Sequence, residues 1–204
     1  MAFTFFFRDI HTLEHVVNHV APAMAGRSAL RVWNAGCAMG METYTMAMLF
    51  AEKLGYFGFK NLTIDATDID GSNLFAEIIN TGIYADEDLQ RIPDLYRNKY
   101  FQPADKSGHS QIIELVRSRV KFQRHDLLSL KPVGSSYSLV LCKNVLLHFT
   151  PAERVQVMRM FHDSLAPGGF FAVEQTQILP EELQPHFDRV VADAQLYKKK
   201  DAVP

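Results

Sequence analysis

The stretch VWNAGCAMGMETY, from Val32 to Tyr44, joins the first clear apolar run of the chain to a helical pattern. A strand that ends at a tight turn and continues into a helix is typical of α/β proteins, which bind cofactors at this connection. Gly36 and Gly40 let the backbone approach a ligand at two points, but the stretch lacks the G-x-G-x-x-G spacing of a dinucleotide loop and a phosphate-binding Lys. The spacing therefore suits a nucleoside without a pyrophosphate, such as S-adenosylmethionine (SAM), better than NAD.

Apolar runs of strand length alternate with helical patterns along the chain. The expected strands are residues 31–36, 62–69, 120–125, 137–142 and 169–175, and the expected helices are residues 42–54, 72–81 and 151–165. Thr150, Pro151 and Glu153 form a helix-start signal, APGG predicts a turn after that helix, and the tail HFDRVVADAQLYKKK is expected to add a hairpin or edge strand. The alternation predicts an α/β fold with a parallel sheet and helices on both faces.

Length and composition favour a single domain over residues 1–204. A turn-rich segment at about residues 84–119 predicts an excursion off the main sheet, where substrate or partner recognition is often added to a common fold. The net charge of −2 gives no general attraction to nucleic acid. Cys37 and Cys142 form no C-x-x-C pair, which fits the cytoplasm, and no run approaches the roughly 18–20 apolar residues that span a membrane.

Polar residues follow the expected strands at the edge where open parallel sheets bind ligands. Asp68 ends the second strand, where a carboxylate accepts hydrogen bonds from two ribose hydroxyls. We interpret Asp68 as that ligand and Asp70 as a cap of the next helix, although a cap is the alternative for Asp68 too. Glu42 suits the cationic amino-acid end of SAM, or is simply an acid favoured in a first helical turn. The other residues at this edge include Cys37, Asp126, Leu127, Lys143, Asn144, Val145 and His148.

Several motifs occur in one order from about residue 4 to residue 198. They are TFFFRD, the opening stretch, ATDID with INTGIY, YFQ, LVLCKNVLLHF and LAPGGFFAVEQTQ. In this order they resemble signatures of the chemotaxis receptor methyltransferases, the CheR family, such as T-x-F-F-R-E/D and F-C-R-N-V-L-I-Y-F. The resemblance implies a Rossmann-like class I SAM-dependent methyltransferase, with a mostly parallel seven-stranded sheet, helices on both faces and a small β-subdomain inserted at residues 84–119.

The resemblance also implies an activity and a site. The implied reaction methylates glutamate side chains of a chemoreceptor-like protein and converts SAM to S-adenosylhomocysteine (SAH). Arg8 is expected near the methionine carboxylate or the transferred methyl group, and His148 close to the methyl-transfer centre, which makes these two the candidate catalytic residues. The candidate cofactor residues are Thr4, Arg8, Gly36, Cys37, Gly40, Glu42, Asp68, Asp126, Leu127, Asn144 and Val145, with Leu127 against the adenine. The inserted subdomain docks a receptor tail in some members of the family.

The sequence also departs from the family pattern. Met41 replaces a Glu, Asp126 an Asn and His148 a Tyr, and VEQTQ replaces G-x-S-E. The family's helical N-terminal domain does not precede TFFFRD, which is expected of a trimmed chain or a minimal relative. These departures leave two alternatives open. In the first alternative, the chain is a SAM-binding signalling or scaffold module without catalysis. In the second, it is a methyltransferase for a different acceptor.

HTLEH, from His11 to His15, matches the H-x-x-E-H zinc-protease pattern, and His19 adds a third histidine at helical spacing. A zinc site would need a further acidic ligand from another helix, and none is marked out in the sequence. We therefore interpret these histidines as a solvated or half-buried helix face and expect no metal. We also expect Cys37 and Cys142 to be buried apolar residues rather than nucleophiles, and residues 5–7 to serve packing.

Overall fold

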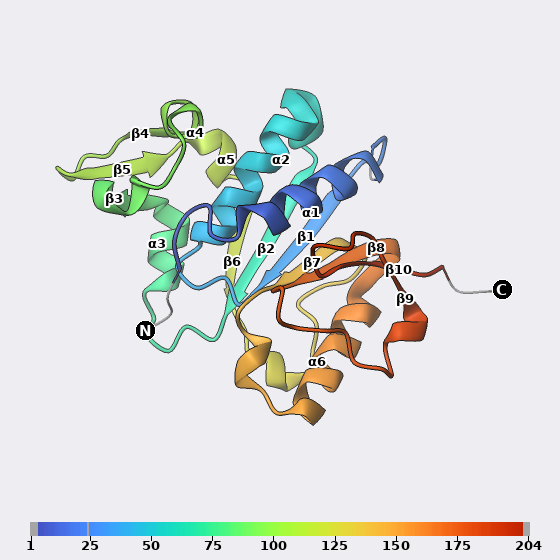
Figure 1. Cartoon of the computed structure of the whole chain (residues 1–204). Helices are drawn as coiled ribbons and strands as arrows, with labels where there is room; N and C mark the ends of the chain where they lie inside the picture. The colour runs from blue at the N-terminus through green and yellow to red at the C-terminus, as the bar shows by residue number, and fades with distance from the viewer. Residues whose placement is uncertain (1–3, 24, 202–204) are drawn as a thin grey trace.

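The computed structural model describes residues 4–23 and 25–201. The main strands are β1 (Leu30–Ala35), β2 (Leu62–Asp68), β6 (Val120–Arg124), β7 (Tyr137–Cys142), β8 (Leu165–Val173), β9 (Phe187–Arg189) and β10 (Leu196–Lys199). They form one sheet in the order β6-β2-β1-β7-β8-β10-β9, in which β10 is antiparallel to both of its neighbours and the strands from β6 to β8 are parallel (Figure 1). The predicted mostly parallel, seven-stranded sheet is confirmed. The chain leaves β1 toward β2 and returns to β7, so the direction of strand order reverses between β1 and β7.

Helices cover both faces of this sheet (Figure 1). Outside the excursion, the α-helices of the described residues are α1 (Ile10–Ala23), α2 (Met41–Phe59), α3 (Phe75–Thr81) and α6 (Pro151–Ser164). Side chains of α1 and α2 share a buried cluster with Val32 of β1, whereas side chains of α6 share a second cluster with Trp33, the next residue of the same strand. Successive strand residues point to opposite faces, so one strand supplies both cores. The expected helices on both faces are therefore present.

The excursion folds as a small separate sheet beside the main one (Figure 1). Its elements are β3 (Ile83–Ala85), η1 (Asp86–Leu89), α4 (Asp94–Tyr100), β4 (Phe101–Pro103), β5 (His109–Ile112) and α5 (Glu114–Arg117). The strands are antiparallel in the order β3-β5-β4. Phe6 is fully buried, and its ring meets those of Tyr84 and Phe101 edge-on at 4.9 and 5.6 Å. The N-terminal segment thus packs against the excursion, as expected for residues 5–7.

Two helix boundaries differ from those expected. The helix expected at residues 42–54 extends to Phe59, but Gly55 has non-helical dihedrals (φ 65°, ψ 178°) just after the expected end. The next helix begins at Phe75 rather than at residue 72, because the Asp70 carboxylate accepts hydrogen bonds from the backbone of Leu74 and Phe75 at 3.3 and 3.1 Å. The expected role of Asp70 as a cap is confirmed. The helix ends at Gly82, whose φ of 63° is the left-handed value typical of a C-terminal glycine.

The turn predicted at APGG is wrong. These four residues lie inside β8, which begins at Leu165 directly after α6. The pairing with β7 shifts register between Tyr137 and Leu139, and Gly168 has a φ of 66°. Four residues of β8 lie opposite one residue of β7 here, so β8 carries three extra residues and its glycines belong to a bulge rather than a turn. The hairpin expected in the tail is confirmed as β9 and β10.

Within the part of the chain that the structure describes, every helix is too short or too polar to cross a bilayer.

Candidate functional site

A cavity of about 640 Å³ opens at the carboxyl ends of β1, β2, β6 and β7. Its volume lies within the range of about 300–1,000 Å³ that is common for small-molecule sites. The cavity spans the point where the direction of strand order reverses. Four loops from distant parts of the chain therefore face one space, as the position of ligand sites in open parallel sheets predicts.

Most of the candidate residues line this cavity. They are Thr4, Arg8, Gly36, Cys37, Glu42, Asp68, Asp126, Leu127, Asn144, Val145 and His148. Gly40 is the exception among the predicted residues, because it lies at the N-cap of α2 with a φ of 84°, and a Cβ there would lie 2.7 Å from Ile79 Cγ1. Gly40 serves the close packing of α2 on α3 rather than lining the cavity.

Gly36 lets the loop after β1 approach the loop after β7. Its φ is 82°, and a Cβ built on it would lie 2.1 Å from Val145 Cγ2. Its backbone N–H donates to the carbonyl of Thr67 at 2.7 Å, which ties the loop to the end of β2. Any side chain here would therefore clash with Val145 and also strain the backbone.

The Asp68 carboxylate is held in place by backbone N–H groups. Its Oδ2 accepts from Ala38 N at 2.9 Å, and its Oδ1 accepts from Asp70 N at 3.1 Å. A carboxylate offers about four lone-pair sites, so two bonds leave capacity for further donors. Asp68 lines the cavity, and its free lone pairs are suited to hydroxyl groups.

A buried ion pair forms the floor of the cavity. Lys143 Nζ lies 3.2 Å from Glu42 Oε2 and 3.4 Å from Asp9 Oδ2, and the Lys143 side chain is fully buried. Asn34 Nδ2 donates to Glu42 Oε1 at 3.1 Å, so both oxygens of Glu42 have a neighbour. Lys143 Nζ has no hydrogen-bond partner among the residues that the structure describes. A buried ammonium group in a cavity wall is suited to an anionic group of a ligand.

Arg8, from the N-terminal segment, also lines the cavity. Its Nη2 donates to Asn144 Oδ1 at 3.1 Å, across 136 residues of sequence. Asn144 has a left-handed backbone (φ 59°), and its N–H donates to Glu174 Oε2 at 3.1 Å. Glu174 is buried at the end of β8 and therefore positions Asn144 from behind. Arg8 and Asn144 belong to separate sequence motifs, and the fold joins them.

Residues after β6 and β7 complete the cavity wall. Asp126 Oδ1 accepts from Leu128 N at 2.9 Å and so caps the short helix η2 (Leu127–Ser129). Leu127 itself is buried. His148 ends η3 (Leu146–His148) and is exposed, so it lies at the open side of the cavity.

Neither cysteine has the character of a nucleophile. Burial raises the pKa of the Cys37 and Cys142 thiols well above their ordinary value, so both remain protonated at neutral pH. Met41, which replaces a family acid, is 3% exposed and packs in the core instead of lining the cavity. Met41 therefore takes no part in the cavity wall.

The candidate residues from the sequence leave out part of the cavity wall. The additional lining residues are Ala38, Thr67, Ile69, His125, Leu128, Lys143, Leu147 and Phe149. Only Lys143 had a signal, as the cation between the end of β7 and Asn144. The direction of the other side chains depends on loop geometry, which local sequence patterns do not specify.

Comparisons with known proteins agree on one family. Residues 2–195 match the family model described as CheR methyltransferase, SAM binding domain. Over 181 residues the chain is 33% identical to an uncharacterized 104.1 kDa protein of Rhodobacter capsulatus, an alignment that covers 86% of this chain and 18% of that protein. Over 166 residues it is 31% identical to a chemotaxis protein methyltransferase of Listeria monocytogenes, with 80% of this chain and 60% of the relative covered.

One solved structure supports the fold. The crystal structure of DszA carbon methyltransferase is similar, with a TM-score of 0.51 and 14% sequence identity over 85% of this chain and 37% of that one. At this level of identity the similarity concerns the fold alone.

Proposed function

This chain belongs to the CheR methyltransferase family, and we propose that it transfers a methyl group from SAM to glutamate side chains of a chemoreceptor-like protein. The observation that carries the proposal is one cavity at which Glu42, Asp68, Arg8 and Asn144 meet. The Arg8–Asn144 hydrogen bond brings the N-terminal motif to the cofactor site.

The charges of the cavity suit SAM. Asp68 would hold the ribose hydroxyls, Glu42 would attract the ammonium group, and the cation Lys143 would attract the carboxylate of the methionine part. Gly36 contributes to this site indirectly, because its missing side chain leaves room for Val145, which lines the same cavity. When bound, SAM supplies a methyl group on a positively charged sulfur.

The chain's own residues would act by positioning. A glutamate acceptor is ionised at pH 7, so the chain needs no general base. Arg8 can hold an acceptor carboxylate by paired, charge-assisted hydrogen bonds, while Asn144 restricts where the guanidinium group lies. His148 at the open side is the second residue that an incoming side chain would meet.

The test is a transfer assay with methyl-labelled SAM and receptor-containing membranes. We expect a base-labile methyl ester on receptor glutamates. Arg8→Ala should reduce transfer by about 100-fold or more, with a smaller loss of SAH affinity, because effects on positioning can reach this size. Arg159→Ala, at an exposed position on α6 away from the cavity, is the matched control and should retain transfer.

Three other outcomes of these assays would each change the proposal in a different way. Full activity of Arg8→Ala would remove Arg8 from the mechanism. Binding of SAH without transfer to any receptor preparation would favour the SAM-binding signalling module instead. Failure to bind SAH would contradict the role of the cavity itself.

We assign receptor docking to the small sheet and expect the reaction to occur in the cytoplasm. Strand β4 is an edge strand with Gln102 exposed, and edge strands can pair with extended peptides. Titration with receptor-tail peptides should shift the amide resonances of β4, and shifts confined to other elements would contradict this docking. Both cysteines are free, which is typical of a reducing compartment.

A further inference from the structure

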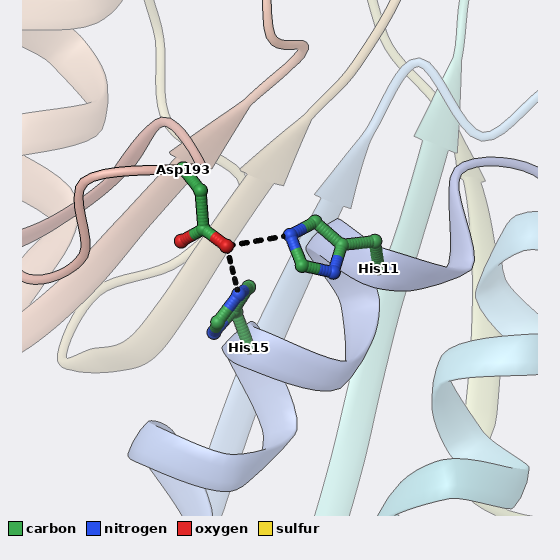
Figure 2. Close-up of side chains that lie close together, drawn as sticks. All are labelled: His11, His15 and Asp193. Atoms are coloured by element: carbon green, nitrogen blue, oxygen red, sulfur yellow. Dashed lines mark hydrogen bonds and ion pairs between the residues drawn. The ribbon is translucent and has the colours of Figure 1, made fainter.

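Two histidines and an aspartate from the two ends of the chain lie close together (Figure 2). His11 and His15 lie one turn apart on α1, and Asp193 lies in the connection between β9 and β10. His11 Nε2 is 2.9 Å and His15 Nε2 is 3.2 Å from the same oxygen, Asp193 Oδ2. One ligand atom from each residue lies within 4.8 Å of the other two, so all three point toward one another.

We propose that His11, His15 and Asp193 bind a divalent transition-metal cation, with Zn²⁺ as the ion that the ligands fit. Imidazole nitrogen and carboxylate oxygen are regular ligands of Zn²⁺, and a site with three protein ligands keeps a fourth position for water. Bonds of about 2.05 Å in a tetrahedron place two ligand atoms about 3.3 Å apart, close to the two measured separations. Small side-chain movements would therefore suffice to admit the ion.

The types of the three ligands favour one class of cation. Two imidazoles and a carboxylate are a combination that binds zinc, copper, nickel and iron in proteins, whereas Mg²⁺ and Ca²⁺ prefer oxygen ligands. The ligand set therefore selects the class of metal.

The site differs from that of a zinc protease. The acid of the H-x-x-E-H pattern, Glu14, lines a depression with Leu49 of α2 and Tyr96 of α4 and is not part of the cluster. The acidic ligand is Asp193 of the C-terminal hairpin, 182 residues from His11, rather than a residue of another helix. A metal here would tie the first helix to the last hairpin, which is a structural role.

The test uses the tag-free full chain with Zn²⁺ in titration calorimetry and Co²⁺ as a spectroscopic probe. We expect one Zn²⁺ per chain and visible absorption bands of four-coordinate Co²⁺. Substitutions His11→Ala, His15→Ala and Asp193→Asn should each weaken Zn²⁺ binding by about tenfold or more, since even groups behind the ligands affect affinity by that factor. Zn²⁺ should also raise the melting temperature of the wild type but not of these variants.

Two matched controls use the same residue types. His19→Ala removes the next histidine of α1, which is not part of the cluster, and Asp163→Asn removes a carboxylate paired with one histidine, His162. Both should keep Zn²⁺ affinity. The proposal is wrong if the wild type binds no Zn²⁺, or if Asp193→Asn binds it as tightly as the wild type does. The side chains of His11 and Asp193 are 62% and 59% exposed, so their replacement should leave the core intact. Unchanged SAH affinity of these variants would confirm that they are folded.

Discussion

Gly36 shows how a single residue sets the shape of the cavity. Its close neighbour is Val145, from a loop more than a hundred residues later in the chain. The sequence indicates only that a glycine lets backbone approach a ligand. The structure adds that the first contact of any side chain here would be Val145, so the same glycine also holds two loops together.

Gly36→Ala should therefore reduce SAH affinity and stability together. The Cβ would lie 2.1 Å from Val145 Cγ2, and the backbone φ of 82° would be strained. Gly26→Ala is the matched control, because Gly26 has the same φ of 82° but its new Cβ would have no atom within 4 Å. The free energy of unfolding of the control should fall by only about 1–2 kcal/mol, because alanine is disfavoured in a left-handed backbone conformation. Its SAH affinity should be unchanged. Calorimetry measures the SAH affinity and urea unfolding measures the stability. Equal SAH affinity in the two variants would show that the contact with Val145 does not affect the cavity.

Helix α6 shows how far local sequence specifies an element. Thr150, Pro151 and Glu153 predict its start, and the structure has the full capping box. Glu153 Oε2 accepts from Thr150 N at 2.8 Å, while the Thr150 hydroxyl accepts from Glu153 N at 3.4 Å. Every group involved lies within four residues, so the signal needs no tertiary context.

Thr150→Ala should destabilise the protein by about 1 kcal/mol at pH 7, the usual effect of removing an N-cap side chain. Hydrogen bonds from the backbone and hydroxyl of Thr150 lower the pKa of Glu153, so the bonded carboxylate stabilises the fold above its unfolded pKa of about 4.3. That contribution is lost as pH falls through the lower folded pKa, so the gap between wild type and variant should narrow in acid. Urea unfolding at several pH values measures the difference in free energy of unfolding between the wild type and the variant.

Ser135→Ala is the control for the cap, since Ser135 is an exposed hydroxyl residue between elements. It should change the free energy of unfolding by less than about 0.5 kcal/mol at every pH. A gap between wild type and Thr150→Ala that stays constant in acid would show that Glu153 takes no part in the cap.

The N-terminal segment contacts both the cavity and the small sheet. Phe6 packs between Tyr84 and Phe101 of the small sheet, while Thr4 and Arg8 on either side line the cavity. The segment thus connects the cofactor site to the excursion. One substitution in this segment should therefore alter both the affinity for the ligand and the packing of the small sheet.

Phe6→Ala should reduce stability by about 3–5 kcal/mol, the usual loss for a buried Phe, and should also weaken SAH binding. Amide exchange should rise in β3 to β5, because these strands lose their contact with the ring. Phe57→Ala is the control, because Phe57 is 84% exposed. Its replacement should lower the free energy of unfolding by less than about 0.5 kcal/mol. Unchanged exchange in the small sheet of Phe6→Ala would contradict this coupling.

The sequence alone determined the fold class, the family and the identity of most cavity residues. Strand and helix periods, caps and motif order are local properties, and they survive in the one-dimensional pattern. The errors are local as well: APGG predicts a turn, but a bulge inside a strand uses the same glycines.

Only the tertiary structure decided which side chains act together. The position of Lys143 against Glu42, the orientation of Gly40 toward α3, and the meeting of His11 with Asp193 appear in no local pattern. Arg8 and Asn144 are separated by 136 residues, and His11 and Asp193 by 182. Contacts over such separations form because the buried sheet places its strand ends and helices in space, and a linear pattern carries no record of that placement.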